Sequence, residues 1–262
     1  MKIDLTFSAT NIDELQLRDK NVVVIDVLRS STTVVTALAN GAREIIPVPN
    51  IESAVKISGS LFGDVTLRGG ERSGKMIQGF NLGNSPLEYT EATVKGKSII
   101  YCTTNGSVAM SKSRYARNMV VAAFVNLSKV TEFITQMNDD VVIICAGNTT
   151  VANGFSLEDV VCGGMIVLQL SEQENVQLEL SDSALAARSL YKSFGRSILK
   201  MIKNSGHGKY LASIGYDEDI KYSAKVDSIP VLPVLSGNVV KIRKEEKRDA
   251  ELETTQVAKQ SD

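Results

Sequence analysis

Residues 22–33 read VVVIDVLRSSTT, an apolar run that breaks off into an acid, a base and four hydroxyl side chains. The β-branched residues at its start predict a strand in the interior of a sheet. Asp26 and Arg29 follow at the end of that strand, and Ser30 to Thr33 open the helical pattern beyond it. Polar groups in this position are typical of α/β proteins, whose ligands bind beyond the carboxyl ends of the strands.

Short β-branched runs alternate with helical patterns along residues 1–154. Several runs are apolar on both faces, as a mainly parallel sheet covered by helices requires. Helices are expected between the runs at residues 31–42, 85–92 and 126–137. Strands are expected at residues 2–7, 21–27, 43–49, 64–70, 97–104, 118–124 and 140–147. The pattern predicts an α/β protein with a mainly parallel or mixed sheet.

The predicted secondary structure changes near residue 155, from short strands alternating with helices to longer helices. Residues 1–154 form the predicted sheet region and carry most of the motifs. Residues 155–243 show longer helical patterns, and we expect a helical or mixed region that packs on the same site. Residues 244–262 are densely charged with few apolar residues, so we expect a disordered tail.

Composition excludes several classes of protein. Among 262 residues, 29 Lys and Arg balance 30 Asp and Glu, so nothing calls for nucleic acid or an anionic membrane as a partner. Acids interrupt the apolar N-terminus and no run is long enough to span a bilayer, so we expect a cytoplasmic protein. Three cysteines without paired spacing indicate reduced, buried thiols. The oligomeric state stays open, with a homodimer as one candidate.

Polar side chains follow nearly every predicted strand, and in a doubly wound sheet they would meet on one rim. Arg29 and Arg72 suit a clamp on phosphate or carboxylate oxygens. The backbone N–H groups of Ser30 to Thr33 and of Thr104 to Ser107 suit helix starts that bind an anion. Hard oxygen ligands for Mg²⁺ are supplied by Asp26, Glu71, Glu158 and Asp159. The combination predicts a small anionic phosphate ester bridged to a metal ion.

Each of these residues also has a structural interpretation. Arg29 could form an ion pair with Asp26. Glu158 and Asp159 lie in a predicted first helical turn, where acids favour the helix dipole. His207, the single histidine, lies between two glycines, and a functional and a structural role stay equally open for it.

Five segments of the chain together resemble the 2-phosphosulfolactate phosphatase family over about residues 1–235. They are VVVIDVLRSSTTVVTALANGA, GGERSGKMIQGFNLGNSPLEY, CTTNGSVAM, CAGN with the following FSLEDVVCGG, and SGHGKYLASIGYDEDIKYSAKVDSIPVLP. The resemblance implies a cytoplasmic, Mg²⁺-dependent phosphatase with a three-layer α/β/α fold. Its reaction would convert (R)-2-phospho-3-sulfolactate to 3-sulfolactate and phosphate.

The resemblance also implies the residues of the site. The catalytic candidates are Asp26, Glu71 and His207. The metal-binding candidates are Asp26, Glu158 and Asp159, so Asp26 is either a nucleophile or a metal ligand. The substrate-binding candidates are Arg29, Arg72, Asn84, Ser85, Thr104, Asn105 and Gly106. Asn81 departs from the family loop, in which we expect Asp, and activity would change if that acid were a ligand or a base.

Two functions of other classes stay open. Asp26 and Cys145 both end strands, so a cysteine hydrolase of a small amide or ester would need no metal. A non-catalytic sensor of small anions would bind its ligand without turnover, with the charged tail as a partner-binding segment. A haloacid-dehalogenase phosphatase does not fit, because its motif needs a second Asp two positions after the first and Leu28 stands there.

Overall fold

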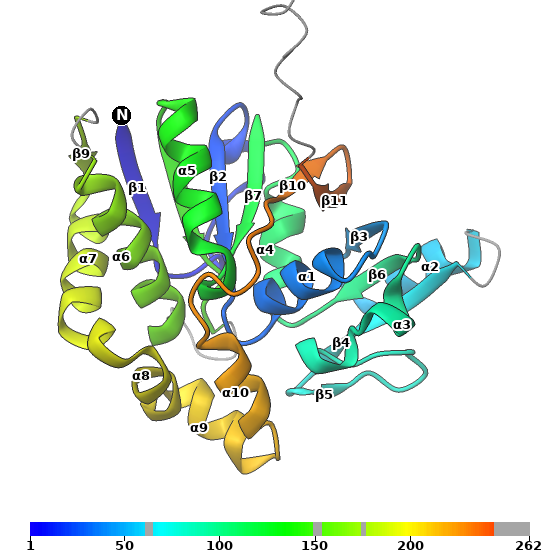
Figure 1. Ribbon diagram of the computed structural model, residues 1–262. Coiled ribbons are helices and arrows are strands. Elements are labelled where there is room, and N and C mark those ends of the chain that lie inside the picture. Colours follow the sequence, from blue (N-terminus) through cyan, green and yellow to red (C-terminus); the bar gives the residue numbers. More distant parts are fainter. Residues whose placement is uncertain (61–64, 149–153, 174–176, 244–262) are drawn as a thin grey trace, which may run out of the picture.

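The computed structural model describes residues 1–60, 65–148, 154–173 and 177–243. In these ranges eleven strands form one mixed sheet in the order β5-β4-β6-β3-β11-β10-β7-β2-β8-β1-β9 (Figure 1). The strands are β1 Lys2–Thr6, β2 Asn21–Ile25, β3 Glu44–Pro47, β4 Thr66–Arg72, β5 Lys75–Met76, β6 Ser98–Cys102, β7 Asn118–Ala122, β8 Val141–Cys145, β9 Glu179–Leu180, β10 Pro233–Ser236 and β11 Val239–Ile242. The predicted α/β class is confirmed.

The sheet consists of two parallel blocks joined by an antiparallel hairpin. Strands β4, β6 and β3 form one block, and β7, β2, β8, β1 and β9 form the other. Strands β10 and β11 pair with each other and lie between β7 and β3, antiparallel to both. Every strand expected from the sequence is present, because each is an apolar run that pairs on both of its edges.

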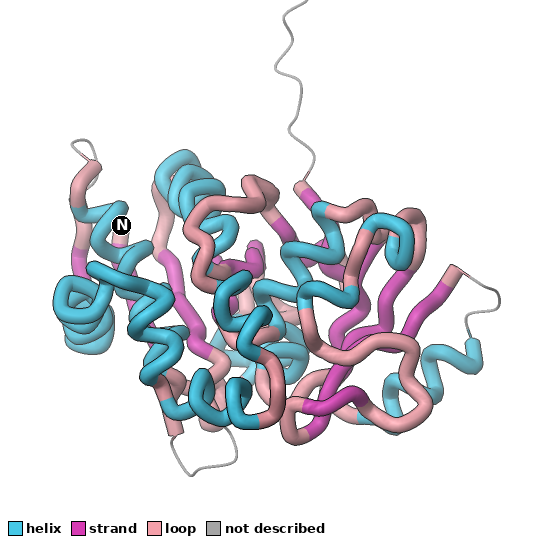
Figure 2. Tube along the Cα trace, turned by 60° about the horizontal axis from the view of Figure 1, so that its bottom comes forward, coloured by secondary structure: helices cyan, strands magenta, loops and turns pink. Residues whose placement is uncertain are grey.

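Helices cover both faces of the sheet, as Figure 2 shows from below. One core lies between the second block and α5, α6 and α7, and the opposite core lies under α1 and α4. Helix α2 covers the outer face of the first block. The helices are α1 Ser30–Ala39, α2 Ile51–Ser60, α3 Glu91–Val94, α4 Gly106–Lys112, α5 Leu127–Met137, α6 Leu157–Ser171, α7 Asp182–Phe194, α8 Ile198–Asn204, α9 Gly206–Ser213 and α10 Asp217–Ser223. The expected three-layer arrangement is therefore confirmed.

Strand β2 shows why the chain folds in this way. Val22 and Val24 belong to the core under α1, whereas Val23 and Ile25 belong to the core under α6. From Asn21 to Ile25 the strand pairs in parallel with β7 on one edge and with β8 on the other. A strand buried on both faces and paired on both edges has one register. The residues that follow Ile25 are therefore delivered to a fixed point at its carboxyl end.

The C-terminal part is more helical, as expected, but it also contributes strands to the sheet. The strands expected from the sequence all end before residue 148, whereas β9 extends one edge of the sheet and β10 and β11 lie at its centre. One core holds residues from both sides of residue 155. Residues 244–262, the expected tail, lie outside the described residues. Within the described ranges, no helix is both long enough and apolar enough to cross a membrane.

Gly164 sets the close approach of α6 to α7. A Cβ at this position would lie 2.0 Å from the backbone oxygen of Ala187, on α7. Gly164→Ala therefore forces the two helices apart, and we expect the free energy of unfolding to fall by about 1–3 kcal/mol in urea denaturation.

Gly59→Ala is the matched control, because a Cβ at this exposed position of α2 meets no atom of the described residues within 4 Å. Alanine is the better helix former, so this variant should gain about 0.5–1 kcal/mol. Wild-type stability in Gly164→Ala would contradict the close packing of α6 on α7.

Candidate active site

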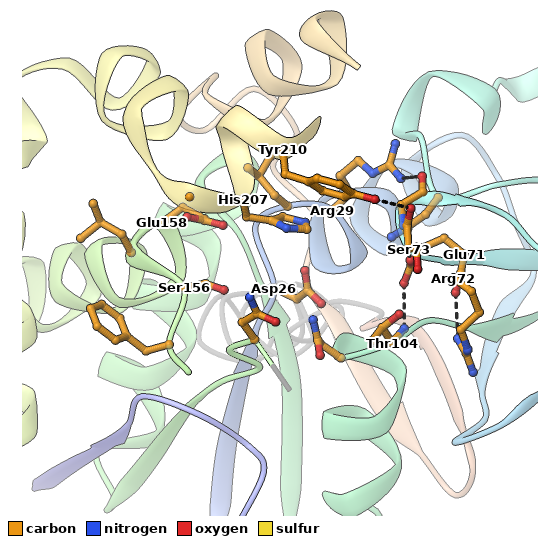
Figure 3. Close-up of a pocket in the computed structure, with 18 residues that line it drawn as sticks. Asp26, Arg29, Glu71, Arg72, Ser73, Thr104, Ser156, Glu158, His207 and Tyr210 are labelled. Carbon is orange, nitrogen blue, oxygen red and sulfur yellow. Dashed lines mark hydrogen bonds between the residues drawn. The ribbon is translucent and has the colours of Figure 1, made fainter. Parts of the chain in front are cut away.

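A cavity of about 560 Å³ lies where the carboxyl ends of β2, β4, β6 and β8 face the starts of α6 and α9 (Figure 3). Both parallel blocks and the C-terminal helices contribute to its wall. Most of the predicted site residues line it, namely Asp26, Arg29, Glu71, Arg72, Asn84, Thr104, Asn105, Glu158 and His207. Ser85, Gly106 and Asp159 do not line it.

Asp26 is held at this wall by the starts of two helices. The backbone N–H of Ser30, the first residue of α1, donates to Asp26 Oδ1 at 3.2 Å. Gly106, the first residue of α4, makes a second backbone hydrogen bond to the same carboxyl group. Only glycine fits there, because a Cβ would lie 2.6 Å from Asp26 Oδ2. These hydrogen bonds hold the carboxyl group in place. Asp26 is 6% exposed, so this group has little contact with solvent.

The carboxyl group of Asp26 lies close to two other acids of the cavity. Burial, together with the negative charges of Glu71 and Glu158, raises the pKa of Asp26 to about 7, while the hydrogen bonds from Ser30 and Gly106 oppose the rise. Near neutral pH the group is therefore in the middle of its titration. A cation beside it would favour the ionised form.

The two helix starts that we expected to bind an anionic ligand bind the protein's own acids. At α1, the Ser30 N–H donates to Asp26 Oδ1 and the Ser31 N–H donates to the backbone oxygen of Asp26. Before α4, the Thr104 N–H donates to Glu71 Oε1 at 2.8 Å. These three donors are engaged within the protein, and ligand binding at the two helix starts stays a prediction.

The hydroxyl groups after β2 serve the fold as well. Ser31 Oγ accepts from the backbone N–H of Asp26 at 2.9 Å, and Thr33 Oγ1 donates to the backbone oxygen of Asn84 at 2.9 Å. Both hydroxyl groups are buried. They join the end of β2 to α1, and α1 to the loop that carries Asn84, without using water.

Glu71 joins two loops of the cavity wall. Its Oε1 accepts from the Thr104 N–H and its Oε2 accepts from the Gly74 N–H, each at 2.8 Å. Ser73 and Gly74 form the two-residue turn between β4 and β5, with φ of 49° and 72°. Two positive φ values are typical of a type I′ hairpin. Glu71 therefore fixes this turn against the loop after β6.

Tyr210 closes the cavity over that turn, and the sequence analysis did not select it. Its hydroxyl donates to the backbone oxygen of Ser73 at 2.9 Å (Figure 3). It follows His207 on α9 by three positions, with 6.1 Å between the ring centroids. This spacing puts both rings on one helix face, which was the available signal. Phe155, an exposed aromatic on the opposite wall, was missed too and carried no such signal.

Arg29 is held by protein groups on several sides. Its Nη1 donates to Asp219 Oδ2 at 2.7 Å, its Nη2 donates to the Gly74 backbone oxygen at 2.5 Å, and its guanidinium lies 4.0 Å from the ring centroid of Tyr216. The residue is 2% exposed. A structural ion pair was one of our two interpretations, but its partner is Asp219 on α10, whereas we had named Asp26.

Ser85 and Arg72 complete the wall around this ion pair. The Ser85 hydroxyl donates to Asp219 Oδ1 at 2.7 Å from behind the wall. Arg72 runs along the wall, where its Nη1 donates to the backbone oxygen of Glu71 at 2.8 Å and its Nη2 donates to Cys102 Sγ at 3.2 Å. A guanidinium carries five N–H donors, so Arg72 keeps donors that a ligand could use.

Glu158 lines the cavity and has one buried carboxyl oxygen without a hydrogen-bond partner in the described part of the chain. The residue lies in the first turn of α6 and is 1% exposed, and the oxygen without a partner is Oε2. Burial raises the pKa of its carboxyl group, while a hydrogen bond with Ser205 opposes the rise. A buried carboxylate oxygen without a partner is costly unless a proton or a cation meets it.

The carboxyl group of the neighbouring Asp159 accepts hydrogen bonds from backbone N–H groups. Its two oxygens accept from the Val27 N–H at 2.8 Å and from the Gly147 N–H at 3.3 Å. Burial and the charges of Asp26 and Glu158 raise the pKa of Asp159 well above its ordinary value. Because it does not line the cavity, we leave it out of the metal site proposed below.

The ring of His207 faces the cavity (Figure 3). Burial and the positive charge of Arg29 lower its pKa, while the charge of Glu71 and a hydrogen bond to the Leu28 backbone oppose the fall. The ring nitrogen that bonds Leu28 carries the proton. The other nitrogen is then an acceptor, as a general base requires.

The acids of the cavity fit a small cation. Asp26, Glu71 and Glu158 line it together with Arg29, which is already paired, and Arg72. Within the described ranges, no group of three or more His, Cys, Asp or Glu side chains is arranged to hold a metal ion by itself. Mg²⁺ needs no such group, because it usually keeps several waters and binds through one or two carboxylates and phosphate oxygens. Asp26 and Glu158 fit that donor set.

Cys145 and Asn81 lie away from the cavity. Cys145 is fully buried in the core under α6, and burial raises the pKa of its thiol well above the ordinary value. A cysteine hydrolase would need an accessible thiolate there, which the structure does not provide. Asn81 is exposed, and its Oδ1 accepts from the Arg68 N–H at 2.9 Å. An Asp at this position would accept the same bond.

The sequence was compared with families of known proteins once this geometry was established. The family model described as 2-phosphosulpholactate phosphatase matches residues 6–238. The chain belongs to this family. The match covers β2 to β10, the last residue of β1 and all of the residues that line the cavity, and it ends just before β11.

Relatives of this family resemble the chain over most of its length. A probable 2-phosphosulfolactate phosphatase from Clostridium acetobutylicum is 39% identical over 233 residues, which is 89% of this chain and 97% of the relative. One from Caldanaerobacter subterraneus is 38% identical over 88% of this chain and 94% of the relative. One from Clostridium botulinum is 37% identical over 92% of this chain and 99% of the relative.

Arg29 and Arg72 should contribute different amounts to the free energy of unfolding. Arg29→Ala leaves Asp219 buried without its charged partner, so we expect the free energy of unfolding to fall by about 3–5 kcal/mol. Arg72→Ala removes two hydrogen bonds at a half-buried position, and we expect a loss of about 1 kcal/mol. Urea denaturation of both variants measures the difference.

The double variant Arg29→Ala with Asp219→Ala is the control, because it removes both charges together. It should be less destabilised than the sum of the two single variants. If Arg29→Ala unfolds at the wild-type urea concentration, the ion pair with Asp219 does not hold this wall.

Proposed function

We propose that this protein is a phosphatase that hydrolyses 2-phosphosulfolactate and releases inorganic phosphate. Membership of the family and the names of the relatives support the substrate. The observation in the structure that carries the proposal is the buried, unpartnered Oε2 of Glu158, a residue that lines the cavity together with Asp26. Two buried acids without a cation between them suit a site that binds a metal and a phosphate together.

The charges of the cavity explain why a cation is part of the proposal. The substrate would bring a phosphate, a carboxylate and a sulfonate into a cavity lined by three acids and two arginines. Arg29 is paired with Asp219, so the wall alone would repel such an anion. We propose Mg²⁺ as the cofactor, with Asp26 and Glu158 as its ligands. When bound, the ion would neutralise the phosphate oxygens and orient the ester.

The proposed roles of the other residues follow from their contacts. The lowered pKa of His207 favours a neutral ring, and its hydrogen bond to the Leu28 backbone leaves the other ring nitrogen as an acceptor, so it would accept a proton from the attacking water. As the phosphorus–oxygen ester bond breaks, that proton would return to the leaving alkoxide. Arg72 and Thr104 would contact the anion, and Glu71 would position Thr104 through its backbone N–H.

We also propose a cytoplasmic location. Cys102, Cys145 and Cys162 are unpaired and buried, which supports a reducing compartment such as the cytoplasm. The absence of a nucleic-acid partner and the candidate homodimer stay predictions from the sequence.

The test is phosphate release from 2-phosphosulfolactate, measured with the purified full-length protein. We expect turnover with Mg²⁺, loss of turnover after removal of divalent metal by EDTA, and recovery when Mg²⁺ is restored. Asp26→Asn and Glu158→Gln should each lower kcat by at least about 100-fold, because each removes a charged ligand of the cation.

Glu91→Gln is the control, since Glu91 is an exposed acid paired with Lys95 on α3 and should leave turnover unchanged. No phosphate release by the wild type with any divalent metal would overturn the proposed activity. Full turnover after EDTA treatment would overturn the metal and leave the activity standing.

A further inference from the structure

Asn84 is a cavity residue whose backbone is fixed from several sides. Its backbone oxygen accepts from Thr33 Oγ1 at 2.9 Å. The residue before it, Gly83, donates its N–H to Glu88 Oε2 at 2.5 Å and accepts at its backbone oxygen from the Tyr89 hydroxyl at 2.7 Å. Asn84 is buried and still lines the cavity. The only freedom left to it is the rotation of its side-chain amide.

Tyr101 removes that freedom. Its side chain is fully buried in β6, and its hydroxyl donates a hydrogen bond to Asn84 Oδ1. The phenol oxygen also has a side-chain hydrogen bond with Ser30, and the phenol proton goes to Asn84, so the amide oxygen is the end of Asn84 that points at Tyr101. The amide nitrogen then points away from Tyr101. In the described part of the chain, no hydrogen bond from this nitrogen to an acceptor is seen, and Asn84 lines the cavity.

We propose that Tyr101 is a positioning residue that makes Asn84 a donor to the anionic substrate. The inference rests on the proposed function, because it concerns the same cavity. Without the phenol hydroxyl the amide could turn by half a rotation and present its oxygen to the cavity, where an anion would be repelled. Three acids already line this cavity, so a fixed neutral donor has a large effect on which ligands it accepts.

The chain contains a matched control for this proposal. Tyr89 is also fully buried, packs edge to face on Tyr101 with 6.4 Å between the ring centroids, and donates its hydroxyl to a backbone oxygen. Tyr101→Phe and Tyr89→Phe therefore each remove one buried hydroxyl from the same aromatic pair. Only the first of these releases the side-chain amide of Asn84.

The test compares steady-state kinetics of 2-phosphosulfolactate hydrolysis with Mg²⁺. We expect Tyr101→Phe to lower kcat/KM by about 10- to 100-fold, and Tyr89→Phe by less than about threefold, at similar stabilities in urea. In an Asn84→Ala background, Tyr101→Phe should have no further effect, because Tyr101 acts through Asn84. Asn84→Asp keeps an acceptor for Tyr101 and loses both donors, so it should be at least as impaired as Tyr101→Phe.

Each outcome decides one claim. An active wild type with equal kcat/KM in Tyr101→Phe and Tyr89→Phe overturns the positioning role, and so does full activity in Asn84→Asp. An additive effect of Tyr101→Phe on Asn84→Ala also overturns it, since the hydroxyl would then act on something else. An inactive wild type overturns the proposed function and is recognised before any variant is made.

Discussion

The carboxyl group of Asp26, held between the starts of α1 and α4, is the contact on which the cavity depends. Helix α1 follows β2 in one parallel block of the sheet, and α4 follows β6 in the other. Their backbone N–H groups meet on this one side chain, and Gly106 allows the approach because it has no Cβ. Burying an acid beside Glu71 and Glu158 costs free energy, which the backbone hydrogen bonds offset only in part. A cation at this position would offset the remainder, so the cost of burying these acids and the proposed chemistry have the same origin.

A second contact, the ion pair of Arg29 with Asp219, holds the C-terminal helices against the cavity. This ion pair joins the end of β2 to α10, and Arg29 also binds the turn between β4 and β5. Tyr210 on α9 binds the same turn from above. The sheet region and the C-terminal helices are therefore fastened at the cavity itself. This arrangement places His207, the proposed base, at the same cavity as the acids.

Local patterns predicted the parts of the structure that are set locally. The strands that the sequence predicts are long apolar runs, and their carboxyl ends place Asp26, Glu71 and Thr104 at one cavity as expected. Among the strands it did not predict, β5 and β9 have two residues each, while β10 joins β7 and β11 joins β3 through one residue pair each. The partner of Arg29 could not be predicted, because Asp219 lies 190 positions further along the chain. The sequence also does not show that acids from the strand ends reach the helix starts, which were predicted as ligand sites.

The most direct test is the pH dependence of stability for the wild type and Asp26→Asn in EDTA, measured by urea denaturation. The pKa of Asp26 is raised from 3.8 to about 7 on folding, so its contribution is present at low pH and is lost as the pH rises to about 7. The asparagine cannot ionise, and any effect of its amide on the contact with Gly106 is the same at every pH. The account predicts that, between about pH 4 and pH 8, the difference in unfolding free energy shifts in favour of Asp26→Asn by up to about 4 kcal/mol. A difference that stays constant over this range would show an ordinary, hydrated carboxylate and would contradict the account.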